Sequence, residues 1–235
     1  MIKIMGFMKK KEGLTLDEFS HYWGEKHAPL GFDVLPDDIR VSRYVHHYAV
    51  PMEGLGESPF DGVAEFGFED MDMFQKWFAW FMSDGGQALR DDEENFIDRS
   101  STTVVIVEEN VIIPGEDARE DGIKLIAGVK RKSDLTLKEF RQYWREKHAP
   151  LALKVLPQAP SVNRYVHNYG LALEGLGEPA FDGIGEICFD DLDAFMHSTQ
   201  WFLGKGGQVL PDDEENFVDH STRVAVIVEE KSFIR

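Results

Sequence analysis

The chain has few of the residues on which several classes of protein depend. Its one cysteine, Cys188, excludes an internal disulfide framework and predicts a reducing, cytoplasmic location. Lysines and arginines number 25 against 43 aspartates and glutamates, which gives a formal net charge of −18. Because neutralising phosphates requires clustered basic side chains, this balance argues against nucleic acid or an anionic membrane as a partner.

Long apolar runs and familiar catalytic or metal-binding motifs are also missing. No segment is apolar for long enough to span a membrane, and the apolar N-terminus precedes lysines, the reverse of a signal peptide. The sequence has no glycine-rich phosphate loop, no nucleophile-elbow motif and no zinc-type spacing of histidine or cysteine. Its acidic DDEENF segments lack the central glycine and alternating ligands of an EF-hand. We therefore predict no metal ion and no cofactor.

What the chain does contain is one sequence written twice. A shift of 121 residues, from Ile2 to Ile123, aligns Ile2–Arg99 with Ile123–His220 without a gap. The matched segments include LTLDEFSHYWGEKHAPL with LTLKEFRQYWREKHAPL, RYVHHY with RYVHNY, and DDEENFID with DDEENFVD. A period of this length is the size of a small domain rather than of a solenoid repeat. We therefore predict two like domains, at 1–113 and 122–235, joined by a polar linker at 114–121.

Within each repeat, the residue pattern predicts the element order β-α-β-β-α-β. A capping box at Thr15 and Glu18 should start the first helix, and Pro29 should end it within about one turn. Asp70 is expected to cap the second helix, and DDEENF to begin a short helix stabilised by the helix dipole. The apolar and β-branched segments predict strands at 2–10, 43–48, 60–68 and 103–109.

This order is that of the ferredoxin-like arrangement, in which helices cover one face of an antiparallel sheet. The uncovered face needs a partner, and a second copy in the same chain can supply one. We therefore predict an α+β fold of two ferredoxin-like βαββαβ repeats, packed sheet to sheet as an intrachain dimeric α+β barrel. This pseudo-dimer removes the need for a second chain but does not forbid a further homodimer.

The same motifs resemble the EthD family, which belongs to the dimeric α+β barrel superfamily. Each repeat carries W-x-E-K-H-A-P-L, then R-Y-V-H, then F-D-G, then D-E-E-N-F-x-D, in the same order. The resemblance covers essentially the whole chain and implies a small-molecule pocket in each half. Family members include fungal polyketide dehydratases, decarboxylase-like proteins and accessory proteins of ether or aromatic breakdown, so the resemblance implies no single reaction.

One candidate catalytic residue is the histidine before Ala-Pro-Leu, which is His27 in the first repeat and His148 in the second. Imidazole titrates near neutral pH, so it could serve as a general acid or base. A histidine near the end of a helix can instead cap free carbonyls and interact favourably with the helix dipole. Both interpretations stay open from the residues alone.

A second group of candidates lies on the strand at 43–48. Alternation places Tyr44, His46 and Tyr48 on one face of this strand. We expect that face to line the barrel interior, where tyrosine hydroxyls could stabilise a developing enolate and the histidine could move a proton. The alternative is that these rings are core residues with satisfied polar tips. The corresponding residues of the second repeat are Tyr165, His167 and Tyr169.

Two carboxylates per repeat complete the candidate set. Alternation turns Asp61 and Glu65 away from the aromatic side of the strand at 60–68, and so toward the expected barrel interior. There, a carboxylate could orient a histidine or act as a base. Asp61 precedes a glycine, so a role in a turn is equally open, whereas Glu65 lies in mid-strand. Their counterparts in the second repeat are Asp182 and Glu186.

Together these residues predict a cofactor-independent lyase or isomerase. It would dehydrate, decarboxylate or cleave a C–C bond in a hydrophobic aromatic or polyketide-like small molecule. A histidine would take a proton, and Tyr44 or Tyr165 would stabilise the resulting enol or phenolate. The alternatives are a non-catalytic accessory protein that binds a hydrophobic catabolic intermediate, and a haem-using oxidative enzyme with a Soret band. Trp77 in the first repeat corresponds to Ser198 in the second, so the two pockets need not be equivalent.

Overall fold

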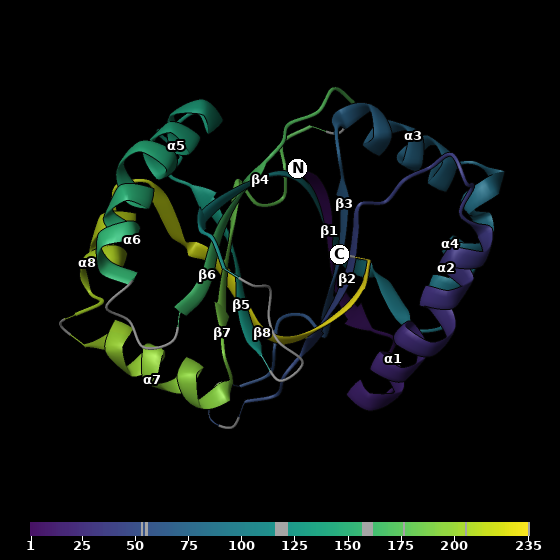
Figure 1. Cartoon of the computed structure of the whole chain (residues 1–235), viewed down its shortest axis with the longest axis horizontal. Coiled ribbons are helices and arrows are strands. Elements are labelled where there is room, and N and C mark those ends of the chain that lie inside the picture. Colours follow the sequence, from purple (N-terminus) through teal and green to yellow (C-terminus); the bar gives the residue numbers. More distant parts are fainter. Residues whose placement is uncertain are drawn as a thin grey trace. The chain divides into compact units, whose positions relative to one another are not determined.

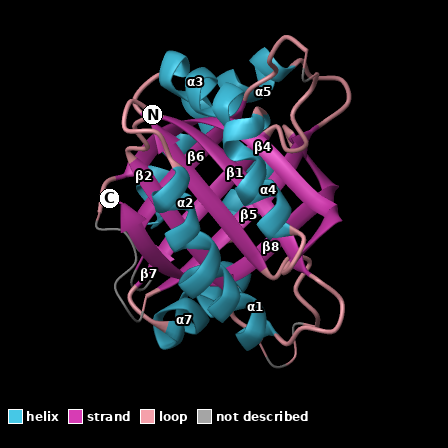
Figure 2. Cartoon of the chain, turned by 90° about the vertical axis from the view of Figure 1, so that its right-hand side faces the viewer, coloured by secondary structure: helices cyan, strands magenta, loops and turns pink. Residues whose placement is uncertain are grey.

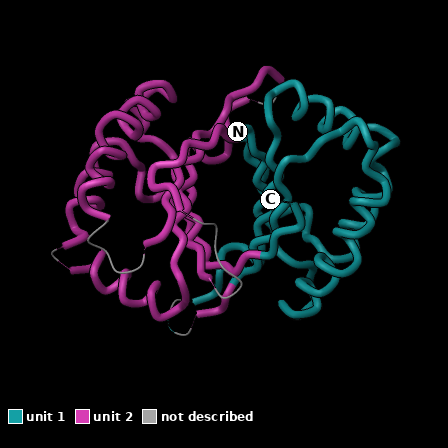
Figure 3. Tube along the Cα trace, viewed as in Figure 1, with its two compact units in different colours: residues 1–49, 53–106, 231–235 teal, residues 50–52, 107–230 magenta. Residues whose placement is uncertain are grey.

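The computed structural model describes residues 1–52, 54, 56–115, 122–156, 162–175, 177–204 and 206–234. The chain forms two compact units (Figure 3). Unit 1 comprises residues 1–49, 53–106 and 231–235, and unit 2 comprises residues 50–52 and 107–230. Each unit thus includes a short segment that the sequence repeat assigns to the other half. Residues 116–121 of the expected linker lie outside the described residues, and the boundaries taken from the repeat stay a prediction.

Unit 1 contains three complete strands, the first part of β4 and the last residues of β8, with helices between the strands of the first repeat (Figure 1). Strand β3 pairs antiparallel with both β1 and β2, so that Tyr44 lies opposite Phe66 and His46 opposite Ala64. Helices α1, α2 and α4 lie across one face of these strands (Figure 2). The elements are β1 (Ile2–Lys10), α1 (Leu16–Tyr22), η1 (Trp23–His27), α2 (Ala28–Val34), β2 (Arg43–Ala49), β3 (Gly62–Phe68), α3 (Met71–Met82), η2 (Asp84–Gly86), α4 (Gln87–Glu93) and β4 (Ile97–Ile113).

Unit 2 repeats this order. Strand β5 pairs with β7 and β8, and β6 pairs with β7 and with residues Val107–Ile113 of β4. The eight strands are hydrogen-bonded in the closed order β1-β3-β2-β8-β5-β7-β6-β4. The predicted α+β class with two βαββαβ repeats is confirmed. The elements are β5 (Ile123–Arg131), α5 (Leu137–Tyr143), η3 (Trp144–His148), α6 (Ala149–Val155), β6 (Val162–Gly170), β7 (Gly183–Phe189), α7 (Leu192–Leu203), α8 (Val209–Glu214) and β8 (Val218–Ile234).

The first helix starts as predicted but does not end at the proline. The Thr15 hydroxyl accepts the Glu18 N–H, and the Glu18 carboxylate accepts the Thr15 N–H at 2.8 Å. The helix then continues through η1, a π-helical turn in which the Ala28 N–H donates to the Trp23 carbonyl. Pro29 therefore falls in the first turn of α2, where a missing N–H costs little. The expectation that Pro29 ends the helix is wrong for this reason, and Pro150 lies in the same position in α6.

The acidic DDEENF segment ends a helix instead of beginning one. Helix α4 ends at Glu93, so Asp92 and Glu93 lie in its last turn. The dipole disfavours negative charge at this end of a helix, so the predicted dipole stabilisation is wrong. These two carboxyl groups have side-chain partners instead, which are Tyr22 and His27 for Asp92 and Arg99 for Glu93.

The core of unit 1 lies between the sheet and the first helical segment. Trp23 packs there with Phe19 and Phe96, and with Met8 and Ile97 from the strands. The corresponding cluster of unit 2 is built from Val129, Phe140, Trp144, Phe217 and Val218. None of the helices in the described part of the chain combines the length and apolar character needed to cross a membrane.

Candidate functional site

A cavity of about 360 Å³ lies in unit 1, between the sheet and the helices. Polar groups reach it at a few points only, namely at His27, Tyr44, Glu93, Arg99 and Thr102. The rest of its wall is mainly apolar and aromatic, with rings from Trp23, Phe32, Phe66, Trp77, Trp80 and Phe81. A concave, mostly apolar space with a few converging polar groups is typical of small-molecule sites. This cavity is the candidate site.

The strand face that carries Tyr44 and His46 packs against the helices. The His46 ring stacks on Trp23 of η1, with 3.8 Å between ring centroids. Tyr44 stacks on Phe66 at 4.4 Å, and Phe66 contacts Trp77 of α3. The expectation that this face lines a barrel interior is therefore wrong. Cross-strand pairing puts Tyr44 and His46 on the aromatic side of β3, which is the side that the helices cover.

The second repeat has the same orientation. His167 stacks on Trp144 of η3 with 4.1 Å between ring centroids, and Tyr165 meets His167 edge-on at 4.7 Å. The expectation that Tyr165 and His167 line a barrel interior is thus wrong for the same reason.

His27 is held by a carboxylate at the end of α4. Its Nδ1 lies 2.8 Å from Asp92 Oδ2, and the Tyr22 hydroxyl donates to Asp92 Oδ1 at 2.8 Å. Burial lowers the pKa of His27, against the opposing effect of the Asp92 hydrogen bond, so the neutral ring prevails at neutral pH. With the Nδ1 proton donated to Asp92, Nε2 keeps its lone pair. This contact, rather than a cap on free carbonyls, fixes the ring and makes it a suitable general base.

Glu93 is a carboxyl group with a strongly shifted pKa. Burial raises the pKa of Glu93 to about 7, although Arg99, whose Nε lies 3.8 Å from Glu93 Oε2, acts in the opposite direction. Such a group is partly protonated at neutral pH and can act as a general acid. Sequence reasoning missed both Asp92 and Glu93. The signal that could have found them is that each repeat joins one His-Ala-Pro motif to one acidic DDEENF motif.

His46 bridges two tyrosines. Its Nε2 lies 2.6 Å from the Tyr44 hydroxyl oxygen, and its Nδ1 lies 2.9 Å from that of Tyr48. Burial lowers the pKa of His46 far below its usual value and raises the pKa of both Tyr44 and Tyr48, so all three groups are neutral. Of the three, Tyr44 lines the cavity.

Asp61 and Asp182 lie at strand ends, away from the cavity. Asp61 Oδ2 accepts the Lys10 N–H at 2.8 Å, which ties the end of β1 to the turn before β3. In unit 2, Asp182 accepts the Arg131 N–H at 2.8 Å and pairs with the Arg131 guanidinium. These contacts match the turn role that the sequence left open.

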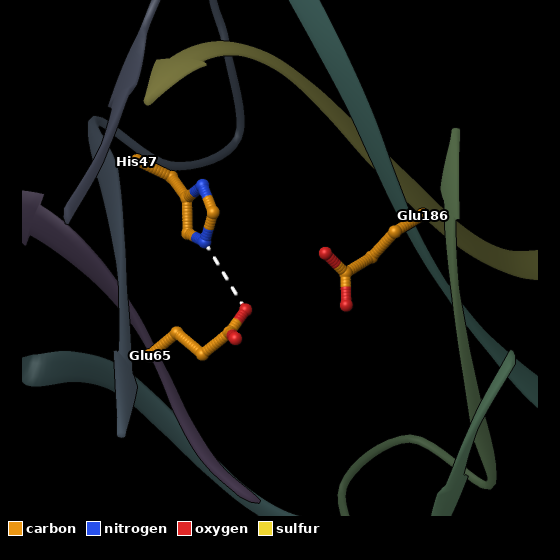
Figure 4. A group of neighbouring side chains, drawn as sticks. All are labelled: His47, Glu65 and Glu186. Carbon is orange, nitrogen blue, oxygen red and sulfur yellow. Dashed lines mark hydrogen bonds and ion pairs between the residues drawn. The ribbon is translucent and has the colours of Figure 1, made fainter. Parts of the chain in front are cut away.

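Glu65 and Glu186 point away from the aromatic face, as alternation predicts, and lie in buried ion pairs. Lys3 Nζ lies 3.1 Å from Glu65, and His47 Nε2 lies 3.3 Å from it (Figure 4). In unit 2, Glu186 lies 3.1 Å from Lys124 Nζ and accepts a hydrogen bond from the Asn168 amide. Neither carboxylate therefore joins the cavity that His27 lines.

The second repeat keeps the histidine–aspartate pair but changes its surroundings. His148 Nδ1 lies 2.8 Å from Asp213 Oδ2, yet the His148 side chain is 2% exposed, against 12% for His27. Glu214, the counterpart of Glu93, is paired with Arg223, which stands where the first repeat has Thr102. A hydrophobic cluster packs over the same region, with Ala152, Leu156, Tyr165 and Leu210 at its centre. The first repeat thus offers the more accessible histidine.

The family model for the EthD domain matches residues 11–100 and 132–221. The chain therefore belongs to the EthD family and carries two EthD domains in tandem. The comparison with curated proteins found no match.

Solved structures of low identity share the fold. An anthrone oxidase-like protein is 10% identical with a TM-score of 0.66, and the match covers 98% of this chain and 92% of that one. A chlorite dismutase variant from Candidatus Nitrospira defluvii is 11% identical with a TM-score of 0.52, covering 97% and 90%. At such identities the likeness shows the fold alone.

Proposed function

We propose that the first repeat is a cofactor-independent acid–base enzyme, a lyase or isomerase acting on a hydrophobic aromatic or polyketide-like molecule. The observation that supports this most is the convergence of His27, Glu93 and Tyr44 on one aromatic-lined cavity. The cavity lies in unit 1, and His27 is more exposed than His148, so we assign the working role to His27 and Tyr44 and treat His148 and Tyr165 as a structural copy.

Each polar group has a distinct part in the proposed chemistry. His27 Nε2 takes a proton from the carbon beside a ligand carbonyl, and Asp92 stabilises the imidazolium that forms. The Tyr44 hydroxyl donates a hydrogen bond to the developing enolate oxygen. Protonated Glu93 gives its proton to a departing hydroxyl group, which leaves as water. Return of the proton to a different carbon, without loss of water, would make the same reaction an isomerisation.

A turnover screen with paired histidine variants tests the proposal. Purified protein is incubated with aromatic and polyketide-type β-hydroxy and β-keto compounds, and the products are measured by mass spectrometry. Tricyclic ketones of the anthrone type belong in the panel, since a protein of the same fold is described as anthrone oxidase-like. We expect His27→Ala to lower turnover about 10²- to 10⁴-fold, the usual contribution of a general base, and His148→Ala to leave it nearly unchanged.

Other outcomes favour the other functions. Equal loss of turnover in both variants would contradict the assignment to the first repeat. Ligand binding without turnover, retained in His27→Ala, would support an accessory protein that binds a hydrophobic intermediate. A Soret band in the absorbance spectrum of the purified protein would support a haem-using oxidative enzyme.

A further inference from the structure

Two residues next to the cavity have no part in the proposed chemistry. His46 is fully buried, and Tyr48 is half-buried at the far end of the same strand face. Hydrogen bonds of 2.6 and 2.9 Å join Tyr44, His46 and Tyr48 into one line, which begins at the cavity wall with Tyr44. A neutral imidazole has one N–H and one lone pair, so it can accept a hydrogen bond from one tyrosine and donate one to the other.

The outer end of this line lies beside exposed charged groups. A Cβ atom placed on Gly24 would lie 2.9 Å from the Tyr48 hydroxyl oxygen and 3.7 Å from Lys231 Nζ. Lys231 pairs with Glu25 at 2.9 Å, and the two side chains are 49% and 56% exposed. The line therefore runs from the solvent-exposed surface of unit 1 to the wall of its cavity.

The second repeat shows that the Y-x-H-x-Y pattern alone does not form such a line. Both ring nitrogens of His167 are buried and have no hydrogen-bond partner among the described residues. Arg145 stands where the first repeat has Gly24, and its guanidinium carbon lies 5.0 Å from the centre of the Tyr169 ring. The Tyr169 hydroxyl accepts a hydrogen bond from the Asn110 amide at 3.3 Å instead. The line is thus a feature of the first repeat, where glycine leaves room beside the hydroxyl.

We propose that Tyr48, His46 and Tyr44 form a proton relay between solvent and the cavity. Tyr44 gives its hydroxyl proton to the ligand, His46 Nε2–H reprotonates Tyr44, and Tyr48 reprotonates His46 at Nδ1. Water then reprotonates Tyr48 and leaves hydroxide in the solvent, which balances the negative charge that the ligand loses. One proton passes along the line, and each O–H or N–H bond that breaks is replaced by one that forms. All three side chains end neutral, and the proton of His46 has moved from Nε2 to Nδ1. A proton that passes along the line in the opposite direction restores the first tautomer.

The environment of the relay suits this concerted route. Burial disfavours the imidazolium form of His46 and the phenolate form of Tyr44, so a stepwise route through either ion is costly. The charged groups beside the outer end are Glu25 and Lys231, and the positive charge of Lys231 also disfavours the imidazolium form of His46. The relay depends on the proposed function in one respect, which is that Tyr44 is the group to which it delivers the proton.

A measurement on the free protein tests the relay without any substrate. The full chain is labelled with ¹⁵N-histidine, and the rate at which the His46 N–H exchanges with water is measured by NMR. We expect Tyr48→Phe, which removes one hydroxyl group, to slow this exchange at least tenfold. Tyr169→Phe is the matched control in the second repeat and should leave the His46 rate unchanged. Equal rates in the wild type and in Tyr48→Phe would overturn the relay.

A second variant interrupts the line while keeping both tyrosines. Gly24→Ala places a methyl group against the Tyr48 hydroxyl and should displace it from His46, with the same slowing of exchange. If a substrate is found, Tyr48→Phe should lower kcat with little change in KM, because Tyr48 does not line the cavity. If Tyr48→Phe slows exchange of the His46 N–H but the wild type converts none of the compounds in the panel, the proposed function is contradicted and the relay stands. Unchanged exchange in both variants would overturn the relay alone.

Discussion

At the scale of single residues, the site depends on carboxyl groups that the surrounding helix does not stabilise. Asp92 and Glu93 lie in the last turn of α4, where the helix dipole opposes their charge. Asp92 offsets this through hydrogen bonds from Tyr22 and His27. Burial raises the pKa of Glu93 to about 7 instead, so Glu93 is partly protonated at neutral pH. Glu93 can therefore act as an acid next to an Asp92 side chain that orients His27.

The raised pKa of Glu93 predicts a pH-dependent loss of stability. A carboxyl group with a raised pKa in the folded state stabilises that state fully below its ordinary value of 4.5, and this contribution is lost as the pH rises through about 7. Between pH 4 and 8, wild type should lose about 3 kcal/mol of unfolding free energy relative to Glu93→Gln, whose amide does not titrate. Urea unfolding at a series of pH values measures the difference. Glu94→Gln, a change at a 69% exposed side chain, is the control and should follow the wild type.

At the scale of elements, the run α1–η1–α2 sets the positions of Trp23 and His27. These two residues are the first and last of the π-helical turn, and both line the cavity. Single π-helical turns inside α-helices occur frequently at functional sites. The turn also lets Pro29 follow without ending the helix. The local irregularity and the candidate site therefore coincide.

The start of this run is testable through its capping box. Thr15→Ala removes the side-chain acceptor for the Glu18 N–H and should lower the unfolding free energy by about 1 kcal/mol. Thr15→Ser keeps the hydroxyl and should lose much less. Thermal or urea unfolding of the two variants distinguishes a cap from simple loss of side-chain volume. Equal losses in both variants would contradict the capping contribution.

Local signals in the sequence predicted the helix starts but not which sheet face the helices cover. The caps at Thr15 and Asp70 were found because side-chain caps follow from residue type and spacing. Alternation along the strand placed Tyr44 and His46 on the same face correctly. It shows which residues share a face but not which face meets the helices. Cross-strand pairing decides that, and pairing between distant segments is not visible in a single strand.

The candidate site was predictable in part for the same reason. His27 and Tyr44 belong to motifs whose chemistry is evident from residue type. Asp92 and Glu93 required the contact between α4 and the first helical run, which joins segments 65 residues apart. Asp61 and Glu65 were candidates because carboxyl groups can act as acids or bases. In the fold, Asp61 accepts a backbone N–H and Glu65 pairs with Lys3, so both have structural roles.

At the scale of the whole molecule, the sequence repeat and the compact units do not coincide. Residues 107–113 continue the first repeat but belong to unit 2, and residues 231–235 continue the second repeat but belong to unit 1. Phe233 therefore packs in unit 1, with ring centroids 4.5 Å from His46 and 5.2 Å from Tyr44. Ile112, its counterpart in the first repeat, packs against the hydrophobic cluster around Leu156 in unit 2. Each unit is thus completed by the end of a strand from the other repeat.

This exchange predicts that a residue near the C-terminus supports a site whose candidate catalytic residues all come from the first repeat. Phe233→Ala and Ile112→Ala each remove a half-buried apolar side chain, so each should lower the unfolding free energy by about 2 kcal/mol. Only Phe233→Ala should also lower turnover and speed exchange of the His46 N–H, because Phe233 lies against His46 and Tyr44. Urea unfolding, product formation and histidine NMR on the two variants measure these effects. If Ile112→Ala lowered turnover as much as Phe233→Ala, the loss would reflect general stability, and the strand end from the second repeat would have no particular role in the site.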